Sequence, residues 1–313
     1  MLKDRIITPE MLSFKDFMAA FRAHYRYGYP QFYGKYSVTE QKVRKNNREL
    51  HGLIVRTPGN RVAPVFYYED FYQAYKKGSS IDECIRTIIN FVENKNLPDN
   101  EFGERLTSWE KNKDRLVVKM INLNKNRLML MHTPFQSFGD MAVIVQIYMI
   151  DPNLGEGAIT VDDDLMAIWS VTSDELFRVA MSNMNHYPVK IEDLMELASE
   201  EEDTDKIAPR IFLCTYDASF HGASAILQTD TLLEFARRKE MDFYVMPVST
   251  HEILLVEQCE GVSGEVLYEM LRSINSDDRI SDSMISEEVY SLRRGQDCLH
   301  YLSNDEELKL AAN

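Results

Sequence analysis

The richest cluster of polar side chains is the run Ser249-Thr250-His251-Glu252, which lies between two expected strands. A hydroxyl beside an imidazole can form a nucleophile and its base, and the neighbouring Glu252 adds a carboxylate for acid–base work. A second explanation is structural, because Ser and Thr hydroxyls commonly hydrogen-bond the backbone of a turn. Both interpretations are open at the level of the sequence.

Asp217 and His221 come from the hairpin that is expected before this turn. If the two hairpins pack side by side, these residues reach the same end of a sheet as Ser249, His251 and Glu252, where loops commonly carry function. Two imidazoles, a hydroxyl and two carboxylates would suffice for a hydrolase or for holding a polar ligand. The competing explanation for each histidine is a structural role with its hydrogen bonds satisfied.

An acidic turn at Asp162-Asp163-Asp164 offers the carboxylate oxygens that Mg²⁺ or Ca²⁺ prefers. The same residues fit a helix N-cap followed by first-turn acids, which the helix dipole favours. We predict no metal site, and Asp162 and Asp164 are the candidate ligands if a metal binds. Because phosphate-binding loops, dinucleotide-binding fingerprints, zinc-protease motifs, nucleophile elbows and EF-hand loops are all missing from the sequence, no cofactor is expected.

Hydrophobic periodicity predicts an α+β fold, with mainly antiparallel sheets built from hairpins that lead into helices and are covered by helices. A helix is expected behind Ser13, a three-stranded meander over residues 38–67, and a hairpin that joins 142–150 to 158–161. Residues 116–123 fit either a strand or a buried helical turn. Beyond residue 206, the expected strands are 211–215, 223–227, 243–247 and 252–257.

Three segments share the order strand, short polar turn and amphipathic helix, at residues 63–75, 157–169 and 222–236. They are either a true internal repeat or the loose similarity that any α+β protein gives.

The acidic run at residues 199–206 contains no apolar side chain to bury. It therefore predicts a linker between two lobes. The expected organisation is a helical, aromatic-rich N-terminal segment (1–36), a first lobe (37–198), a second lobe (207–300) and a tail (301–313).

Charge is distributed unevenly along the chain. Residues 1–56 contain 11 basic and 5 acidic side chains, a net charge of +6, whereas the whole chain carries −15. The acidic remainder argues against binding nucleic acid over the whole surface, since phosphate contacts depend on nearby cations. The N-terminal segment interleaves Tyr and Phe with Arg and Lys over residues 24–36, which is a weak indication of single-stranded nucleic acid binding. The simpler interpretation is that its aromatic rings pack inward.

The composition, with 44% hydrophobic and 27% charged residues, is that of a globular protein. No apolar run approaches the roughly 18 residues of a membrane-spanning helix, so no membrane association is expected. The first residues lack the apolar core of a secretory signal, and the four cysteines form no CxxC pair. We therefore expect a cytoplasmic protein with reduced cysteines.

Several strings in the chain resemble one uncharacterised bacterial family, a domain of unknown function typical of gut Firmicutes. The resemblance is carried from about residue 38 to about residue 290 by KNNRELHGL, KDRLVVKMINLNKN, FGDMAVIVQIYMI, LMAIWSVTSDELFRVAMSN and MPVSTHEILLV. It implies no established activity or catalytic residues. Because members sit among genes of mobile elements, it implies only a loose association with such systems.

Two classes of function follow from these features. The first is a non-catalytic cytoplasmic binding or regulatory protein with a protein partner, which the missing catalytic motifs and the strong charge asymmetry favour. The alternative is an enzyme of unfamiliar type, such as a hydrolase, with its site around His221 and His251. A concave site around His251 would favour the enzyme.

Overall fold

The computed structural model describes residues 11–59, 63–94, 100–151, 155–197, 209–216, 220–277, 280, 282–302 and 307–309. The chain folds into two compact units. Unit 1 comprises Met1–Lys45, Glu49–Leu106 and Asp151–Gly155, and unit 2 comprises Asn46–Arg48, Thr107–Ile150 and Glu156–Asn313. Both units combine antiparallel strands with covering helices, so the predicted α+β class is confirmed.

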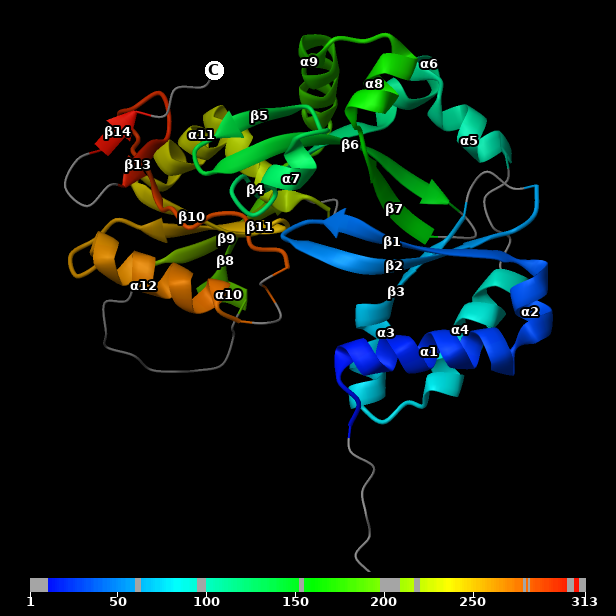
Figure 1. The fold of residues 1–313 in the computed structure, drawn as a ribbon. Helices are drawn as coiled ribbons and strands as arrows, with labels where there is room; N and C mark the ends of the chain where they lie inside the picture. The colour runs from blue at the N-terminus through cyan, green and yellow to red at the C-terminus, as the bar shows by residue number, and fades with distance from the viewer. Residues whose placement is uncertain are drawn as a thin grey trace, which may run out of the picture. The chain divides into compact units, whose positions relative to one another are not determined.

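Unit 1 is a three-stranded sheet in the order β1-β2-β3 with helices against it (Figure 1). The predicted meander is confirmed. The elements are α1 (Phe14–Gly28), α2 (Pro30–Lys35), β1 (Ser37–Lys45), β2 (Arg48–Arg56), β3 (Val65–Tyr67), α3 (Tyr68–Lys76), α4 (Ile81–Asn94) and α5 (Asn100–Leu106).

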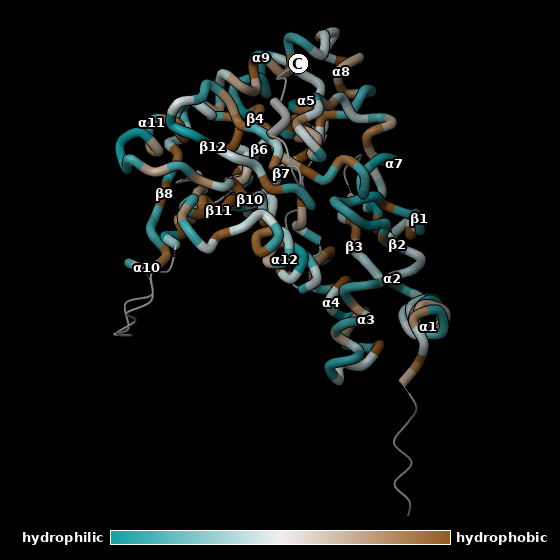
Figure 2. Tube along the Cα trace, turned by 90° about the vertical axis from the view of Figure 1, so that its left-hand side faces the viewer, coloured by the Kyte–Doolittle hydropathy of each residue, from teal (hydrophilic) through white to brown (hydrophobic). Residues whose placement is uncertain are grey.

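Helix α1 begins where the sequence predicts, because the Ser13 hydroxyl caps it by accepting a hydrogen bond from the backbone N–H of Asp16 at 3.2 Å. Figure 2, in which α1 is seen nearly end-on, shows both hydrophobic and hydrophilic residues in this helix. The buried face carries Phe17, Phe21 and Tyr25 at intervals of four residues, which places them on one side of the helix. These rings join a core that also contains side chains from β2, α3 and α4.

The described part of the N-terminal segment, residues 11–36, packs into the core of unit 1. Phe21 packs edge-on against Tyr68 of α3 at a ring distance of 5.3 Å, and Phe32 and Tyr36 are buried in the same core. The expected inward packing holds for these rings, whereas Tyr27 stays 76% exposed. One aromatic core thus joins residues on both sides of position 36, where the sequence analysis places a boundary.

Unit 2 contains a seven-stranded sheet in the order β14-β13-β12-β10-β11-β9-β8, in which neighbouring strands run antiparallel. Its strands are β8 (Val189–Asp193), β9 (Ile211–Tyr216), β10 (Phe243–Ser249), β11 (Glu252–Glu257), β12 (Tyr290–Leu292), β13 (His300–Leu302) and β14 (Glu307–Lys309). Two of these strands, β13 and β14, contain residues of the segment 301–313, which the sequence predicted to be a tail.

Helices cover both faces of this sheet. Phe235 of α11 (Thr229–Lys239) packs against Phe212 and Phe243. Leu267 of α12 (Gly264–Asn275) joins a cluster that contains Met246. Phe243 and Met246 are three positions apart on β10, and therefore point to opposite faces. The short helix α10 (Leu194–Leu197) follows β8.

The second sheet of unit 2 has the order β4-β6-β5, with β7 also paired to β6. Residues 116–122 form a strand and not the buried helical turn that the sequence also allowed. The predicted hairpin is confirmed as the one between β6 and β7. The elements of this part are α6 (Trp109–Asn112), the 3₁₀ turn η1 (Lys113–Arg115), β4 (Leu116–Asn122), α7 (Arg127–Leu130), β5 (Phe135–Phe138), β6 (Met141–Asp151), β7 (Gly155–Thr160), α8 (Asp163–Trp169) and α9 (Ser173–Met184).

The expected strand at residues 223–227 is wrong, because Gly222–Leu227 forms a 3₁₀ helix, η2. Every residue from Gly222 to Ile226 is buried, and the Ser224 hydroxyl donates to the carbonyl oxygen of Val118 on β4 at 3.1 Å. A segment buried on all sides has no periodicity that distinguishes strand from helix. The third of the three similar segments thus lacks the strand that the other two have, and a true repeat is not supported.

The predicted linker at residues 199–206 lies outside the described residues. Between the two units, the longest stretches of chain meet at Leu106 and Thr107, while Asn46–Arg48 belongs to unit 2 and Asp151–Gly155 to unit 1. None of the described helices combines the length and the apolar character that crossing a bilayer requires.

Candidate functional site

The run Ser249–Glu252 forms the turn between β10 and β11. Ser249 and Thr250 are buried. The Ser249 hydroxyl accepts a hydrogen bond from the backbone N–H of His251 at 3.1 Å, and the Thr250 N–H donates to the carbonyl oxygen of Ser283 at 2.8 Å. The hydroxyl of Ser249 therefore stabilises the turn, which is the structural role weighed for it from the sequence.

His221 is buried at the start of η2 in the left-handed backbone region, with φ of 48°. Neither of its ring nitrogens has a hydrogen-bond partner among the described residues. Burial, together with the positive charges of Lys119 and His251, lowers the pKa of His221 to about 3. The imidazole is therefore neutral at pH 7.

His251 lies close enough to His221 for the charge of one ring to act on the other. Burial and Lys119 lower the pKa of His251, and Glu252 opposes them. The two predicted imidazoles thus share one neighbourhood, whereas Asp217 lies outside the described residues. The hydrogen bond of the Ser249 hydroxyl runs to the backbone and not to either ring, so neither imidazole activates Ser249 as a nucleophile.

Asp162, a candidate metal ligand, and His51 of β2 both have partners within the chain. Asp162 caps α8, since its Oδ1 accepts a hydrogen bond from the backbone N–H of Leu165 at 2.9 Å. Among the described residues, no group of three or more His, Cys, Asp or Glu side chains is arranged to hold a metal ion. In unit 1, His51 contacts Glu69 through Nδ1 at 2.7 Å.

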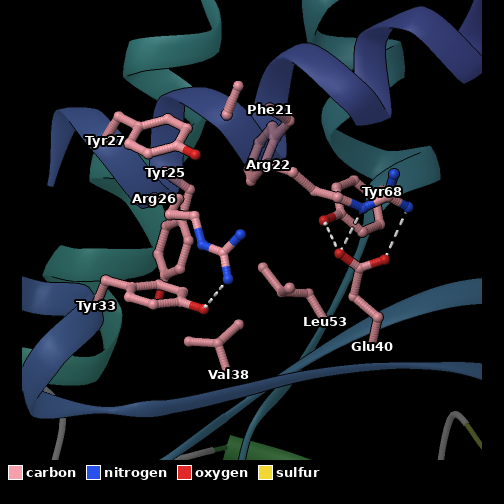
Figure 3. A pocket seen from close by; sticks show the side chains of 11 residues that line it. Phe21, Arg22, Tyr25, Arg26, Tyr27, Tyr33, Val38, Glu40, Leu53 and Tyr68 are labelled. Atoms are coloured by element: carbon pink, nitrogen blue, oxygen red, sulfur yellow. Dashed lines mark hydrogen bonds and ion pairs between the residues drawn. The ribbon is translucent and has the colours of Figure 1, made fainter. Parts of the chain in front are cut away.

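Unit 1 contains a pocket of about 260 Å³ that the sequence analysis did not single out, referred to here as the α1 pocket. Figure 3 shows it between α1 and the strands β1 and β2. Helix α1 contributes Phe21, Arg22, Tyr25, Arg26 and Tyr27. The other walls come from four further elements, with Tyr33 on α2, Val38 and Glu40 on β1, Leu53 on β2 and Tyr68 on α3.

One side of the α1 pocket is closed by an ion pair. Arg22 donates from Nε and Nη2 to the two carboxylate oxygens of Glu40 at 2.7 and 2.8 Å, and the Tyr68 hydroxyl donates to the same carboxylate at 3.0 Å. Burial alone would raise the pKa of Glu40, but the hydrogen bonds from Arg22 and Tyr68 and the charge of Arg22 hold it below its usual value. The positive charge of Arg22 is thereby matched by a neighbouring carboxylate.

The other side of the α1 pocket has a cation without such a match. Arg26 donates from Nη2 to the Tyr33 hydroxyl at 3.2 Å, and its guanidinium lies over the Tyr33 ring at 5.4 Å (Figure 3). In the described part of the chain, no carboxylate forms an ion pair with Arg26. Two tyrosines, Tyr33 and Tyr27, raise its pKa. Arg26 is exposed to solvent and can pair with an external anion.

Tyr25 lines the pocket and is 96% buried, since 4% of its surface remains accessible. Its hydroxyl has no hydrogen-bond partner within the described structure, and burial raises its pKa above the ordinary value. Its ring meets those of Phe32 and Tyr33 edge-on at 5.7 Å. Leaving a buried hydroxyl unpaired costs about 1–3 kcal/mol, so a partner that reached this group would stabilise the folded state.

Comparison with protein families gives one match, a family of unknown function (DUF5688), over residues 14–294. The chain belongs to this family. No curated protein and no solved structure matches it.

The DUF5688 match includes every residue of the α1 pocket, from Phe21 to Tyr68. It confirms the resemblance drawn from the sequence and extends it, since that resemblance began only at about residue 38. Helix α1 is thus within the DUF5688 region. A signal for the pocket was present in the sequence, because Phe21 and Tyr25, like Arg22 and Arg26, are spaced four residues apart on one helix.

Proposed function

We propose that the protein is a non-catalytic binding protein of the bacterial cytoplasm, and that its ligand is anionic and enters the α1 pocket. One observation carries this proposal: among the residues that the structure describes, the same pocket contains a hydroxyl without a partner, on Tyr25, and a cation without a carboxylate partner, on Arg26. Ligand pockets typically combine apolar and aromatic walls with a few well-placed polar groups. The α1 pocket has this composition, with Phe21, Val38 and Leu53 among its walls.

The charge of the sequence supports an anionic ligand. Residues 1–56, which supply most of the pocket, carry +6, while the whole chain carries −15. A positive region on an acidic protein attracts anions locally and raises their rate of association. The enzyme alternative has less support, because neither ring nitrogen of His221 has a hydrogen-bond partner in the described part of the chain and the Ser249 hydroxyl is bonded to backbone.

The proposal predicts that the anionic aromatic dye 8-anilinonaphthalene-1-sulfonate binds the folded chain at a single site and gains fluorescence there. Arg26→Gln should weaken this binding by about tenfold, because it removes a charge-assisted contact worth roughly 1.5–3 kcal/mol. A fluorescence titration at pH 7 measures both affinities, with circular dichroism to verify that each variant is folded.

The matched control is Arg56→Gln, which makes the same charge change in unit 1 at an exposed residue that does not line the pocket. It should leave the affinity within about twofold of the wild-type value. Equal weakening by the two variants, or no saturable binding at all, would contradict the proposal.

A second prediction concerns the Tyr25 hydroxyl. Tyr25→Phe should raise the free energy of unfolding by about 1 kcal/mol, because it removes a buried polar atom that has no partner. The same variant should weaken ligand binding, since the hydroxyl is then missing from the site. Urea denaturation measures the first effect and the dye titration the second.

Tyr36→Phe serves as the comparison, since Tyr36 is also buried in the unit 1 core but does not line the pocket. It should leave dye binding unchanged. A Tyr25→Phe variant that is less stable than the wild type would show that the hydroxyl has a structural partner, and would remove one of the two supports of the proposal.

A further inference from the structure

We infer that the ligand of the α1 pocket is a nucleoside monophosphate. This inference rests on the proposed function and narrows it from an anion to a chemical class. Four features of the pocket carry it: its size, the cation on one side, the exposed ring beside that cation, and the buried hydroxyl.

Size limits the ligand to a small molecule. The pocket volume of about 260 Å³ is slightly below the usual range of roughly 300–1,000 Å³ for ligand pockets. A single nucleotide can place its base in such a space and leave its phosphate at the mouth. A peptide or an oligonucleotide would have to lie mostly outside it.

The phosphate position follows from the two arginines. Arg22 is bonded through two nitrogens to Glu40, whereas Arg26 contacts the tyrosines Tyr33 and Tyr27. A guanidinium presents parallel N–H groups that match two oxygens of one phosphate. Arg26 is therefore the group that receives the phosphate, and Arg22 holds the opposite wall in place.

The base position follows from the aromatic rings beside Arg26. Tyr27 is 76% exposed and Tyr33 is 37% exposed, although both line the pocket. The face of Tyr33 is partly covered by the guanidinium, so Tyr27 offers the more open ring. Stacking of a base on such a ring contributes about 1–3 kcal/mol and accepts any base.

The Tyr25 hydroxyl supplies the remaining polar contact. It can donate to, or accept from, a ring nitrogen, an exocyclic group or a sugar hydroxyl. The hydroxyl is buried and its ring meets the Tyr33 ring edge-on, so a ligand reaches it only if the partly exposed Tyr33 side chain changes rotamer. A ligand with an anionic end, a planar ring and polar ring atoms can contact Arg26, the Tyr27 ring and the Tyr25 hydroxyl at once.

The test is calorimetric titration of the full chain with AMP, adenosine and inorganic phosphate, together with displacement of the sulfonate dye. We expect AMP to bind one site per chain and to displace the dye, with adenosine and phosphate each at least about tenfold weaker. Arg26→Gln should lower the affinity for AMP by about tenfold and leave adenosine unchanged. Tyr27→Ala should weaken both by about tenfold, and Arg56→Gln should weaken neither.

Four outcomes would overturn the inference in distinguishable ways. If the dye binds in an Arg26-dependent manner but AMP, GMP, CMP and UMP fail to displace it at millimolar concentration, the proposed function stands and the ligand class is wrong. If 4-hydroxybenzoate displaces the dye as well as AMP does, the pocket takes aromatic anions in general. If a six-residue single-stranded RNA binds more than about tenfold tighter than AMP, the pocket belongs to a nucleic-acid surface. Failure of both dye and nucleotide would reject the proposed function as well.

Discussion

Gly222→Ala is expected to prevent unit 2 from folding stably, with a loss of about 4 kcal/mol or more in the free energy of unfolding. A Cβ atom at Gly222 would lie 1.9 Å from Oγ1 of Thr215 and 2.0 Å from the backbone carbonyl oxygen of His251. These two atoms are themselves hydrogen-bonded at 2.8 Å, so neither can move without breaking that bond. Urea denaturation followed by circular dichroism measures the loss.

Gly157→Ala is the matched control, because a Cβ at this position on β7 meets no atom within 4 Å. It should change the free energy of unfolding by no more than about 0.5 kcal/mol. The double variant Thr215→Ala/Gly222→Ala tests the mechanism. It should recover only part of the loss, since the carbonyl oxygen of His251 remains in place. A Gly222→Ala protein as stable as the Gly157→Ala protein would show that η2 is loosely packed.

The stability of the chain should fall by about 2 kcal/mol between pH 7 and pH 5 through His221 alone. In the folded protein its pKa is lowered to about 3, whereas in the unfolded chain it returns to its ordinary value of 6.5. Between these two values the unfolded state binds more protons, so acid favours unfolding. The contribution of His221 is fully present above pH 6.5 and is lost progressively as the pH falls toward 3.

His221→Asn isolates this contribution, because Asn tolerates the positive φ of this position and does not titrate. The variant should lose about 2 kcal/mol less than the wild type over the same pH interval, whatever its stability at pH 7. Urea denaturation at pH 7, 6 and 5 gives the change of unfolding free energy with pH for the wild type and for the variant. Carboxylates that titrate in this range affect the two proteins equally. Parallel slopes would mean that the imidazole finds a proton-stabilising partner in the folded state.

Local sequence signals were sufficient for much of unit 1. Ser13 begins α1, and the change to a two-residue period marks the β1-β2-β3 meander. The turn between β1 and β2 carries Asn47 at φ 61°, a conformation that Asn adopts at low cost. These elements could be predicted because capping and turn formation involve residues within three or four positions of one another.

The α1 pocket could not be predicted in the same way. Tyr25, Tyr33, Glu40 and Tyr68 come from four elements spread over more than forty residues, and sequence periodicity shows only that α1 has an apolar face. Whether an aromatic residue of that face is sealed, like Phe17, or borders a pocket, like Tyr25, depends on which side chains the neighbouring elements place opposite it. That is a property of packing.

The sequence by itself determined the α+β class, most of the strand and helix positions, the capping role of Asp162 and the family to which the chain belongs. Only the tertiary structure decided that residues 222–227 form a 3₁₀ helix, because Ser224 bonds to Val118 more than a hundred residues away. It also decided which polar groups lack partners. The sequence does not show that the His221 ring and the Tyr25 hydroxyl lack partners within the described structure, since an unpaired polar atom is defined by all of its surroundings and not by its neighbours along the chain.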